Sequence, residues 1–241
     1  MPSFTAQPIK RRKIYEDVVE ALEGMMLRGE LRPGDAMPSE RELMENFEVG
    51  RTSIREALFA LQKMGLISVR NGERAFVTQP SPKKLISEMS GTVRHMLAQP
   101  AGLREFQDAR ILLESALARA AALQRTEEQM AAITKALEQN KRSIGDLEAF
   151  AQTDVAFHYS IISVLQNTIF IELHAAVYDW LSNQRAIGLQ RGGADMGAFK
   201  GHKAIHDAIK AQDPDKAEAA MRKHLSDVNE NYWTVVEAES R

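Results

Sequence analysis

Four residues in the C-terminal part of the chain have types and spacings that suit a metal site. Asp154 and His158 are four residues apart, so both side chains lie on one face of a single helix. His202 and His224 each occur on an otherwise apolar helix face, with Met221 three residues before His224. One carboxylate and three imidazoles form a good ligand set for a divalent transition metal. From these residues alone, separate histidines that each have their own hydrogen-bond partner remain the more common arrangement.

The donor atoms narrow the choice of metal and the chemistry. Imidazole suits zinc, nickel, copper or iron, and the carboxylate also admits manganese. We expect zinc, with nickel or manganese as alternatives, and open coordination positions for water or for the oxygen atoms of a small molecule. A metal-dependent hydrolase-like enzyme is the alternative interpretation of the same Asp/His cluster. Such an enzyme needs a companion base or nucleophile at a defined spacing, and the sequence has no such motif, so we expect no enzyme.

A second set of candidate residues follows Pro38 and suits DNA. Ser39 and Glu42 have the spacing of a capping box, which predicts the start of a short helix. A turn follows, in which we expect Gly50 to adopt a backbone angle that other residues avoid. The next helix begins near Arg51, and its exposed first turn could enter the major groove of DNA.

Arginine and hydroxyl side chains occupy the start of this next helix. The candidates are Arg51, Thr52, Ser53 and Arg55. A guanidinium group matches two acceptors on the edge of guanine and binds phosphate equally well. A surface helix with solvated arginines fits the same pattern, so the DNA interpretation depends on the residues that follow.

A predicted hairpin after the two helices favours the DNA interpretation. Residues 66–69 and 74–77 have strand patterns, and the Asn-Gly pair between them is a strong hairpin signal. Arg70 and Arg74 lie where the hairpin would form a basic wing. Helix, turn, helix and hairpin together predict a winged helix-turn-helix, with a plain surface hairpin as the alternative.

These helices and the hairpin resemble the N-terminal domain of the GntR family of bacterial transcription regulators, through the segment MPSERELMENFEVGRTSIREALFALQKMGLI. The resemblance covers roughly residues 13 to 78. The DNA contacts that the resemblance implies are Arg41, Arg51, Thr52, Ser53, Arg55 and Gly72. Arg74 of the wing is added to this set as a further candidate. The chain departs from the family pattern at Gly50, where serine is usual, and we expect one phosphate contact to be lost there.

The helical part of the chain resembles the FCD domain that accompanies this winged helix in the FadR subfamily. The matching motifs are TDVAFH, GHKAIHDAI and AMRKHL. The metal ligands that the resemblance implies are Asp154, His158, His202 and His224. It makes His206 a neighbour of the site, whereas His95 and His174 match no motif and are expected to be structural or exposed.

Two arginines are candidates to bind an effector. Arg110 precedes Glu114 by four residues on an otherwise apolar helix, which fits an internal ion pair. The resemblance equally places Arg110 near an effector pocket, where a guanidinium can hold a carboxylate. Arg185 is the second candidate, and a solvated surface arginine fits it at least as well. The stretches NGERA, ISEMSG, DVAFH and DWL resemble regulators of sialic acid catabolism, which implies a small carboxylate or acidic sugar, with N-acetylneuraminate as the leading candidate.

The elements that must position these residues fall into two predicted domains. With 241 residues, 44% of them hydrophobic, the chain can form a core in each. We expect a winged helix-turn-helix domain over 10–78, a linker over 79–82 and an all-helical FCD domain over 83–238 for effector and metal binding and for dimerisation. The predicted fold class is mainly α, with an antiparallel helical bundle as the second domain. Its candidate helices are 83–97, 103–123, 127–144, 147–165, 169–189, 197–211 and 214–237.

Composition excludes several classes of protein. The chain has no cysteine, which excludes disulfides and thiolate metal sites and suits the cytoplasm. No apolar run approaches the roughly 20 residues of a membrane span, and the N-terminus lacks the apolar core of a signal peptide. Residues 1–80 hold 12 Lys and Arg against 12 Asp and Glu, so DNA binding must depend on where the arginines lie.

Together these features predict a cytoplasmic, homodimeric transcription regulator. Its partners would be double-stranded operator DNA and a small organic acid or acidic sugar. The effector would favour one packing of the bundle, and the linker would carry that change to the spacing of two winged helices. We expect a repressor whose operator binding weakens with effector, although the sequence does not determine the sign of that effect.

Overall fold

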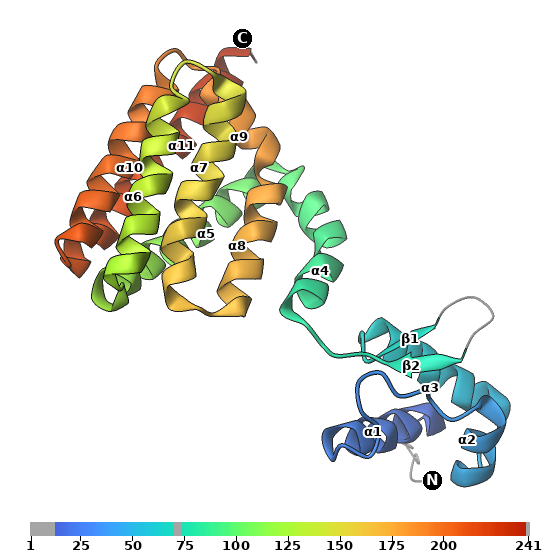
Figure 1. Cartoon of the computed structure of the whole chain (residues 1–241). Helices are drawn as coiled ribbons and strands as arrows, with labels where there is room; N and C mark the ends of the chain where they lie inside the picture. Colours follow the sequence, from blue (N-terminus) through green and yellow to red (C-terminus); the bar gives the residue numbers. More distant parts are fainter. Residues whose placement is uncertain (1–12, 70–73, 240–241) are drawn as a thin grey trace, which may run out of the picture. The chain divides into compact units, whose positions relative to one another are not determined.

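The computed structural model describes residues 13–69 and 74–239 (Figure 1). Contacts divide the chain into two compact units, Met1–Leu85 and Ile86–Arg241, and each is described by itself. The described residues are mainly helical, as predicted, with a helix-turn-helix and a two-stranded wing in the first unit and a helical bundle in the second. The predicted domain boundaries stay a prediction, because this division delimits no linker.

The described part of the first unit contains helices and one hairpin. The elements are α1 (Ile14–Leu27), α2 (Glu40–Phe47), α3 (Arg51–Lys63), β1 (Ile67–Val69) and β2 (Ala75–Val77). The two strands are antiparallel, with Ser68 opposite Phe76. The hairpin of the predicted wing is therefore present, although its predicted Asn-Gly turn, with Arg70 and Gly72, lies outside the described residues.

The start of α2 is capped as predicted, whereas the turn after α2 differs from the prediction. Ser39 Oγ accepts a hydrogen bond from the Glu42 backbone N–H at 3.3 Å, and the Glu42 carboxylate accepts one from the Ser39 N–H at 2.7 Å. Glu48 has the left-handed backbone, with a φ of 54°, whereas Gly50 is extended, with a φ of −70° and a ψ of 155°. The expectation for Gly50 is wrong because α2 ends in a left-handed C-cap, which already reverses the chain.

The apolar faces of α1 and α3 form the core of the first unit. Its completely buried side chains include Leu22, Ile54, Leu61 and Ile67. Burying one such side chain contributes about 1.5–3 kcal/mol to stability. This burial fixes the orientation of α3 and leaves Arg51, at the start of the helix, exposed to solvent.

The second unit is a bundle of helices, the first of which begins within the last residues of the first unit. They are α4 (Pro82–Leu97), α5 (Pro100–Gln124), α6 (Glu127–Arg142), α7 (Leu147–Ile162), α8 (Thr168–Trp180), α9 (Ser182–Leu189), α10 (Ala194–Lys210) and α11 (Pro214–Glu239), with the short 3₁₀ helix η1 (Ser163–Leu165) after α7. Figure 1 shows α6, α7 and α10 running side by side. Among the described helices, none is both long and apolar enough to cross a membrane.

Several helix boundaries differ from those predicted. The helix predicted over 147–165 ends at Ile162 and is followed by η1, and the helix predicted over 197–211 begins at Ala194. The predicted helix over 169–189 is divided at Leu181 into α8 and α9, although neither glycine nor proline lies at the break. Leu181 is buried beside Trp180, whose indole N–H donates to Ser90 of α4 at 3.1 Å. Trp180 and Leu181 thus belong to a buried cluster with residues of α4. Helix α5 begins at Pro100, earlier than predicted, because proline suits the first turn of a helix.

Buried apolar side chains hold the candidate ligands in the bundle interior. One core cluster contains Phe157 and Ile161 of α7, Ile205 and Ile209 of α10, and Met221 and Leu225 of α11. His158, His202 and His224 each lie within one helical turn of these anchors. Because the apolar side chains are buried, the histidines on the same helix faces are buried with them.

Candidate DNA interface and candidate metal centre

The two arginines at the start of α3 share one carboxylate. Arg51 Nε donates a hydrogen bond to Glu40 Oε2 at 2.9 Å, and Arg55 Nε lies 3.8 Å from Glu40 Oε1. Both arginine side chains are 70% exposed. They are therefore accessible to a ligand and lie on the same side of the first unit, toward the start of α2.

Other arginines lie close to this pair. Arg74 and Arg55 line the same surface groove, about 520 Å³ in volume, together with Glu40. Hydrogen bonds from Ser39 lower the pKa of Glu42 below its usual value, and the charges of Arg74 and Arg41 act in the same direction. These contacts bring the wing, the start of α2 and the start of α3 together.

The remaining predicted DNA contacts lie in different environments. Arg41 is exposed and lies 4.0 Å from Glu45, one turn further along α2. Thr52 is exposed and Ser53 is half-buried on the first turn of α3. Gly72 lies outside the described residues. Sequence reasoning did not identify Glu40 as a partner of the arginines, because the two helices that carry them meet only in the folded unit.

In the second unit, the four predicted metal ligands come together. Asp154 and His158 of α7, His202 of α10 and His224 of α11 are all buried, and one ligand atom from each lies within 4.8 Å of the others. His158 Nε2 is 3.3 Å from His224 Nε2. His202 Nε2 is 3.2 Å from Asp154 Oδ1. These donors converge on one point from three helices.

Two acceptors outside the cluster orient its histidines. Glu114 Oε2 is 2.7 Å from His158 Nδ1, and Asn140 Oδ1 is 2.8 Å from His202 Nδ1. Acceptors at Nδ1 place the proton there and leave Nε2 with a free lone pair. His202 Nε2 is buried and has no hydrogen-bond partner among the described residues, since its contact with Asp154 lacks hydrogen-bond geometry. A buried nitrogen without a partner is costly, and a metal ion at this point would satisfy it.

The electrostatics also suit a cation. Burial lowers the pKa of His202 and, more strongly, of His224, which keeps their rings neutral. Burial would raise the pKa of Asp154, but its contact with His202 and the other histidines outweigh that effect and hold its pKa well below the usual range. Neutral imidazoles and an ionised carboxylate are the forms that bind metals. The residues present therefore fit a divalent metal ion.

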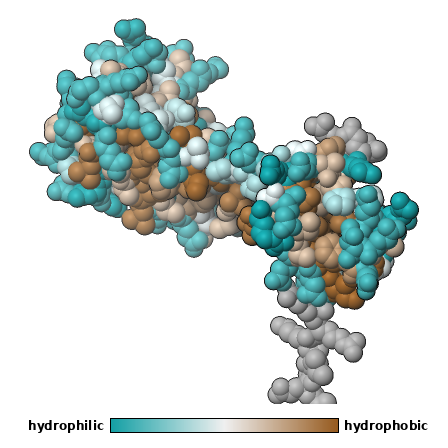
Figure 2. Space-filling model, turned by 60° about the horizontal axis from the view of Figure 1, so that its bottom comes forward, coloured by the Kyte–Doolittle hydropathy of each residue, from teal (hydrophilic) through white to brown (hydrophobic). Residues whose placement is uncertain are grey.

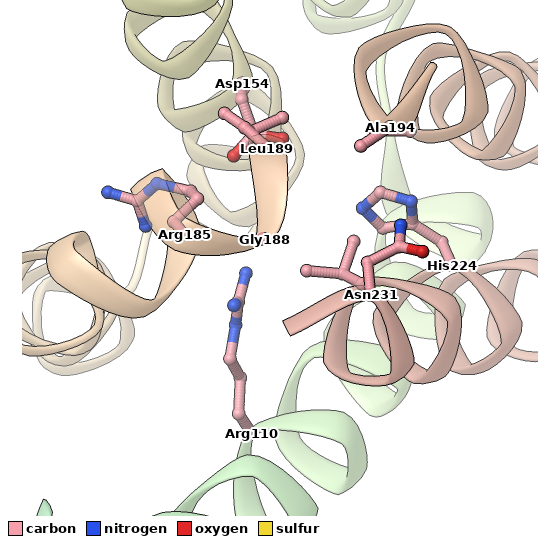
Figure 3. Close-up of a pocket in the computed structure, with 10 residues that line it drawn as sticks. Arg110, Asp154, Arg185, Gly188, Leu189, Ala194, His224 and Asn231 are labelled. Atoms are coloured by element: carbon pink, nitrogen blue, oxygen red, sulfur yellow. The ribbon is translucent and has the colours of Figure 1, made fainter. Parts of the chain in front are cut away.

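Arg110 is buried in an ion pair and also lines a pocket. Its Nε donates to Glu114 Oε1 at 2.6 Å, and its Nη2 donates to the Tyr178 hydroxyl at 2.7 Å. The internal ion pair considered from the sequence is therefore present. Figure 3 shows the guanidinium of Arg110 pointing toward the centre of the pocket, whereas Arg185 extends away from it in this view.

The pocket beside the cluster is small. It has a volume of about 30 Å³, and its polar lining residues are Arg110, Asp154, Arg185, His224 and Asn231. Arg185 Nη2 donates to the Tyr178 carbonyl at 3.1 Å, while its Nε and Nη1 are buried without a partner in the described part of the chain. A second, more open cleft of about 300 Å³ shares His224 and Asn231 with this pocket. His224 therefore borders both the small pocket and the open cleft.

The other histidines differ in their surroundings. His206 contacts Thr134 Oγ1 at 3.0 Å and Asp207 at 2.9 Å, so both of its ring nitrogens have partners outside the cluster. His95 is exposed. His174 is buried against Tyr178, and neither of its ring nitrogens has a hydrogen-bond partner among the described residues. Burial lowers the pKa of His174 to about 4.

Comparison with known proteins gives matches over both units. Residues 14–77 match the family described as bacterial regulatory proteins, gntR family, and residues 105–227 match the FCD domain. The proteins named HTH-type transcriptional repressor NanR of Salmonella arizonae and of Salmonella typhimurium are each 43% identical to this chain over 229 residues. Each alignment covers 94% of this chain and 87% of the relative.

Solved structures show the same fold at lower identity. Streptococcus agalactiae GntR is 23% identical, with a TM-score of 0.58, and the match covers 90% of this chain and 99% of that one. Escherichia coli McbR/YncC is 17% identical, with a TM-score of 0.51, over 95% of this chain and 100% of that one. With a family match in each unit and relatives 43% identical over nearly the whole length, the chain belongs to the GntR family of bacterial transcription regulators with an FCD domain, which is not a family of enzymes.

Proposed function

We propose that this protein is a homodimeric transcription repressor whose binding to operator DNA is weakened by a small organic acid bound at a metal site. Relatives that are 43% identical carry the name transcriptional repressor, which supports repression here. We also infer a cytoplasmic location, because that is where a bacterial regulator meets its DNA.

The proposed DNA contacts are Arg41, Arg51, Thr52, Ser53, Arg55, Gly72 and Arg74. The exposure of Arg51 and Arg55 is the observation that carries this proposal. Both side chains are 70% exposed at the start of α3, while Ile54 and Leu61 anchor another face of the same helix in the core. Such a helix start can enter the major groove, where a guanidinium can bind guanine with two hydrogen bonds.

The proposed metal ligands are Asp154, His158, His202 and His224, and the proposed metal is zinc, with nickel or manganese as alternatives. The unpaired Nε2 of His202 and the acceptors at Nδ1 of two histidines support this choice. A bound divalent metal would supply a Lewis acid for the oxygen atoms of a carboxylate. Glu114 and Asn140 would hold the rings in position.

An acidic sugar, with N-acetylneuraminate first, is the proposed effector. Arg110 would pair with its carboxylate, and Arg185, with two unpartnered nitrogens, is the second candidate. A pocket of about 30 Å³ holds only about two water molecules, whereas small-molecule sites measure about 300–1,000 Å³. The effector would therefore need the adjoining cleft and an opening between α9, α10 and α11. That opening is the change of packing that would alter DNA binding.

A homodimer is proposed because a regulator with two winged helices can read two half-sites of an operator. Apolar side chains gather on parts of the surface of the helical unit (Figure 2). Among its exposed large apolar residues are Leu112, Leu123 and Ile169. Exposed apolar patches are common at protein–protein interfaces, which supports dimerisation through this unit.

The DNA proposal can be tested with duplexes that the full-length protein selects from a randomised library. Arg51→Ala and Arg55→Ala should each weaken binding to the selected duplex by about 1–3 kcal/mol if the contact is bidentate to a base. Arg28→Ala is the matched control, because Arg28 is also exposed and pairs with Glu30 at 2.6 Å, but lies at the end of α1. Unchanged affinity in both α3 variants would contradict the proposed interface.

The effector proposal can be tested by measuring binding to the same selected duplex with N-acetylneuraminate added. We expect the sugar acid to release the duplex from the metal-loaded protein, and a chelator to abolish that response without abolishing DNA binding. His224→Ala should lose metal and the response together. Full metal occupancy in that variant would remove His224 from the ligand set.

A further inference from the structure

Glu40 is held in a defined position at the start of α2. It is the first residue of the helix and directly follows Ser39, the N-cap residue. The reciprocal hydrogen bonds between Ser39 and Glu42 fix the backbone on both sides of Glu40. The carboxylate of Glu40 is consequently presented from a rigid helix start, although its side chain is 36% exposed.

Glu40 uses only one edge of the Arg51 guanidinium. The hydrogen bond of 2.9 Å is donated by Nε. Among the described residues, Arg51 makes its side-chain contact through Nε alone, so the N–H groups of its two terminal nitrogens remain free for a base edge. A guanidinium held at Nε has fewer orientations than a freely rotating one, and so loses less entropy when it binds a base.

The same carboxylate also lies near Arg55, at 3.8 Å. A negative charge in this position repels the phosphates of any DNA duplex and partly neutralises two cations that would attract them. Glu40 therefore reduces the part of DNA affinity that does not depend on sequence. The hydrogen bond from Arg51 to Glu40 acts on the sequence-dependent part of DNA affinity. Only a correctly directed guanidinium matches two acceptors of guanine.

We propose that Glu40 is a specificity-determining residue that directs Arg51 toward a base and suppresses binding to unrelated DNA. This inference rests on the proposed DNA contact of Arg51. In the complex, Glu40 would stay hydrogen-bonded to Nε of Arg51 while the terminal nitrogens meet the base. The plainer role of Glu40, a first-turn acid that stabilises α2 through the helix dipole, predicts no change in base preference.

The test compares two duplexes, the one selected by the full-length protein from a randomised library and a scrambled duplex of equal composition. Glu40→Ala should bind the scrambled duplex about threefold more tightly and lower the ratio of selected to scrambled affinity about fivefold, the scale of one exposed ion pair. Glu40→Gln keeps an oxygen acceptor for Arg51 and should keep that ratio within about twofold. Thermal melting of each variant establishes that it is folded.

Glu56→Gln is the control for charge alone. Glu56 is exposed on α3 and forms no ion pair with the described residues, so this variant should leave the ratio unchanged. A ratio that stays constant in Glu40→Ala, or that falls equally in Glu40→Gln, would overturn the proposal. So would an equal fall in Glu56→Gln.

A double-mutant cycle separates this proposal from the one on which it rests. In an Arg51→Ala background, Glu40→Ala should no longer change the ratio, because the residue that it directs is gone. An undiminished effect in that background would overturn the role of Glu40. If Arg51→Ala alone leaves the ratio unchanged, the proposed DNA contact fails instead.

Discussion

Two arginine–glutamate pairs in this chain have similar geometry and opposite surroundings. Arg51 and Glu40 meet at 2.9 Å with side chains 70% and 36% exposed, whereas Arg110 and Glu114 meet at 2.6 Å with side chains 8% and 3% exposed. In the exposed pair, water can replace either partner at little cost. In the buried pair, loss of one partner leaves an uncompensated charge away from water.

This difference corresponds to what each unit is proposed to do. An arginine that must reach a base while Glu40 still accepts from its Nε needs an exposed ion pair that leaves its terminal nitrogens accessible to DNA. A carboxylate that must orient His158 needs a permanent one, and Arg110 helps to keep Glu114 ionised by holding its pKa well below the usual range, against the opposing effect of burial. The exposed pair is therefore suited to contact with a ligand, and the buried pair to positioning a histidine.

The largest expected effect comes from breaking the buried pair. Arg110→Met should lower the unfolding free energy of the second unit by about 3–5 kcal/mol, because Glu114 would lose its buried counter-charge. Arg51→Met, the exposed counterpart, should cost less than about 1 kcal/mol in the first unit. Both tryptophans, Trp180 and Trp233, lie in the second unit, so their fluorescence during denaturation follows that unit. Equal losses in the two variants would show that burial does not distinguish the pairs.

The second-largest effect is expected on the stability of the second unit in acid. All six histidines lie in this unit. Burial lowers the pKa of His174 to about 4 from the model-peptide value of 6.5. The unfolded chain thus binds this proton more tightly, so the stability associated with neutral His174 is complete above pH 6.5 and is lost as the pH falls toward 4. The shift corresponds to about 3 kcal/mol.

His174→Phe should remove that part of the pH dependence, while the exposed His95→Gln should not. Denaturation of the metal-free protein, repeated between pH 7 and pH 4, measures the difference. An unaltered slope in His174→Phe would contradict a buried neutral histidine at this position.

A smaller effect is expected for the residue that orients His202. Asn140→Ala should weaken metal binding about 10- to 100-fold, because Asn140 Oδ1 would no longer hold the ring through Nδ1. Asn140→Asp keeps the acceptor and should retain more of the affinity. Competition with a chromophoric chelator measures both variants. Equal affinity in Asn140→Ala and the unmodified protein would exclude this positioning role.

The smallest effect is expected at the N-cap of α3. Gly50 has nearly the same backbone angles as Ser39, the N-cap of α2, and a Cβ at Gly50 would meet no atom within 4 Å. Gly50→Ser should therefore cap α3 and stabilise the first unit by a few tenths of a kcal/mol, roughly the amount that Ser39→Gly should cost. Thermal denaturation followed by helix content tests both variants. A lower melting temperature in Gly50→Ser would contradict the N-cap assignment.

The parts predicted correctly from the sequence depend on residues close together in the chain. The capping box of α2 involves Ser39 and Glu42, three residues apart, and their hydrogen bonds form within one helical turn. Asp154 and His158 share a helix face for the same local reason. The convergence of all four metal-ligand candidates came from family resemblance, since spacing alone could not bring three helices to one point.

The sequence by itself determined which segments become helices and which side chains share a face, because those features follow from hydrogen bonds and side-chain periodicity within a turn or two. Only the tertiary structure decided the partners across the chain. Glu114 meets His158 across 44 positions and Asn140 meets His202 across 62 positions, while Arg51 finds Glu40 on another helix. Such contacts depend on how whole helix faces pack, as does the burial of Leu181 at the junction of α8 and α9, where neither glycine nor proline marks the break.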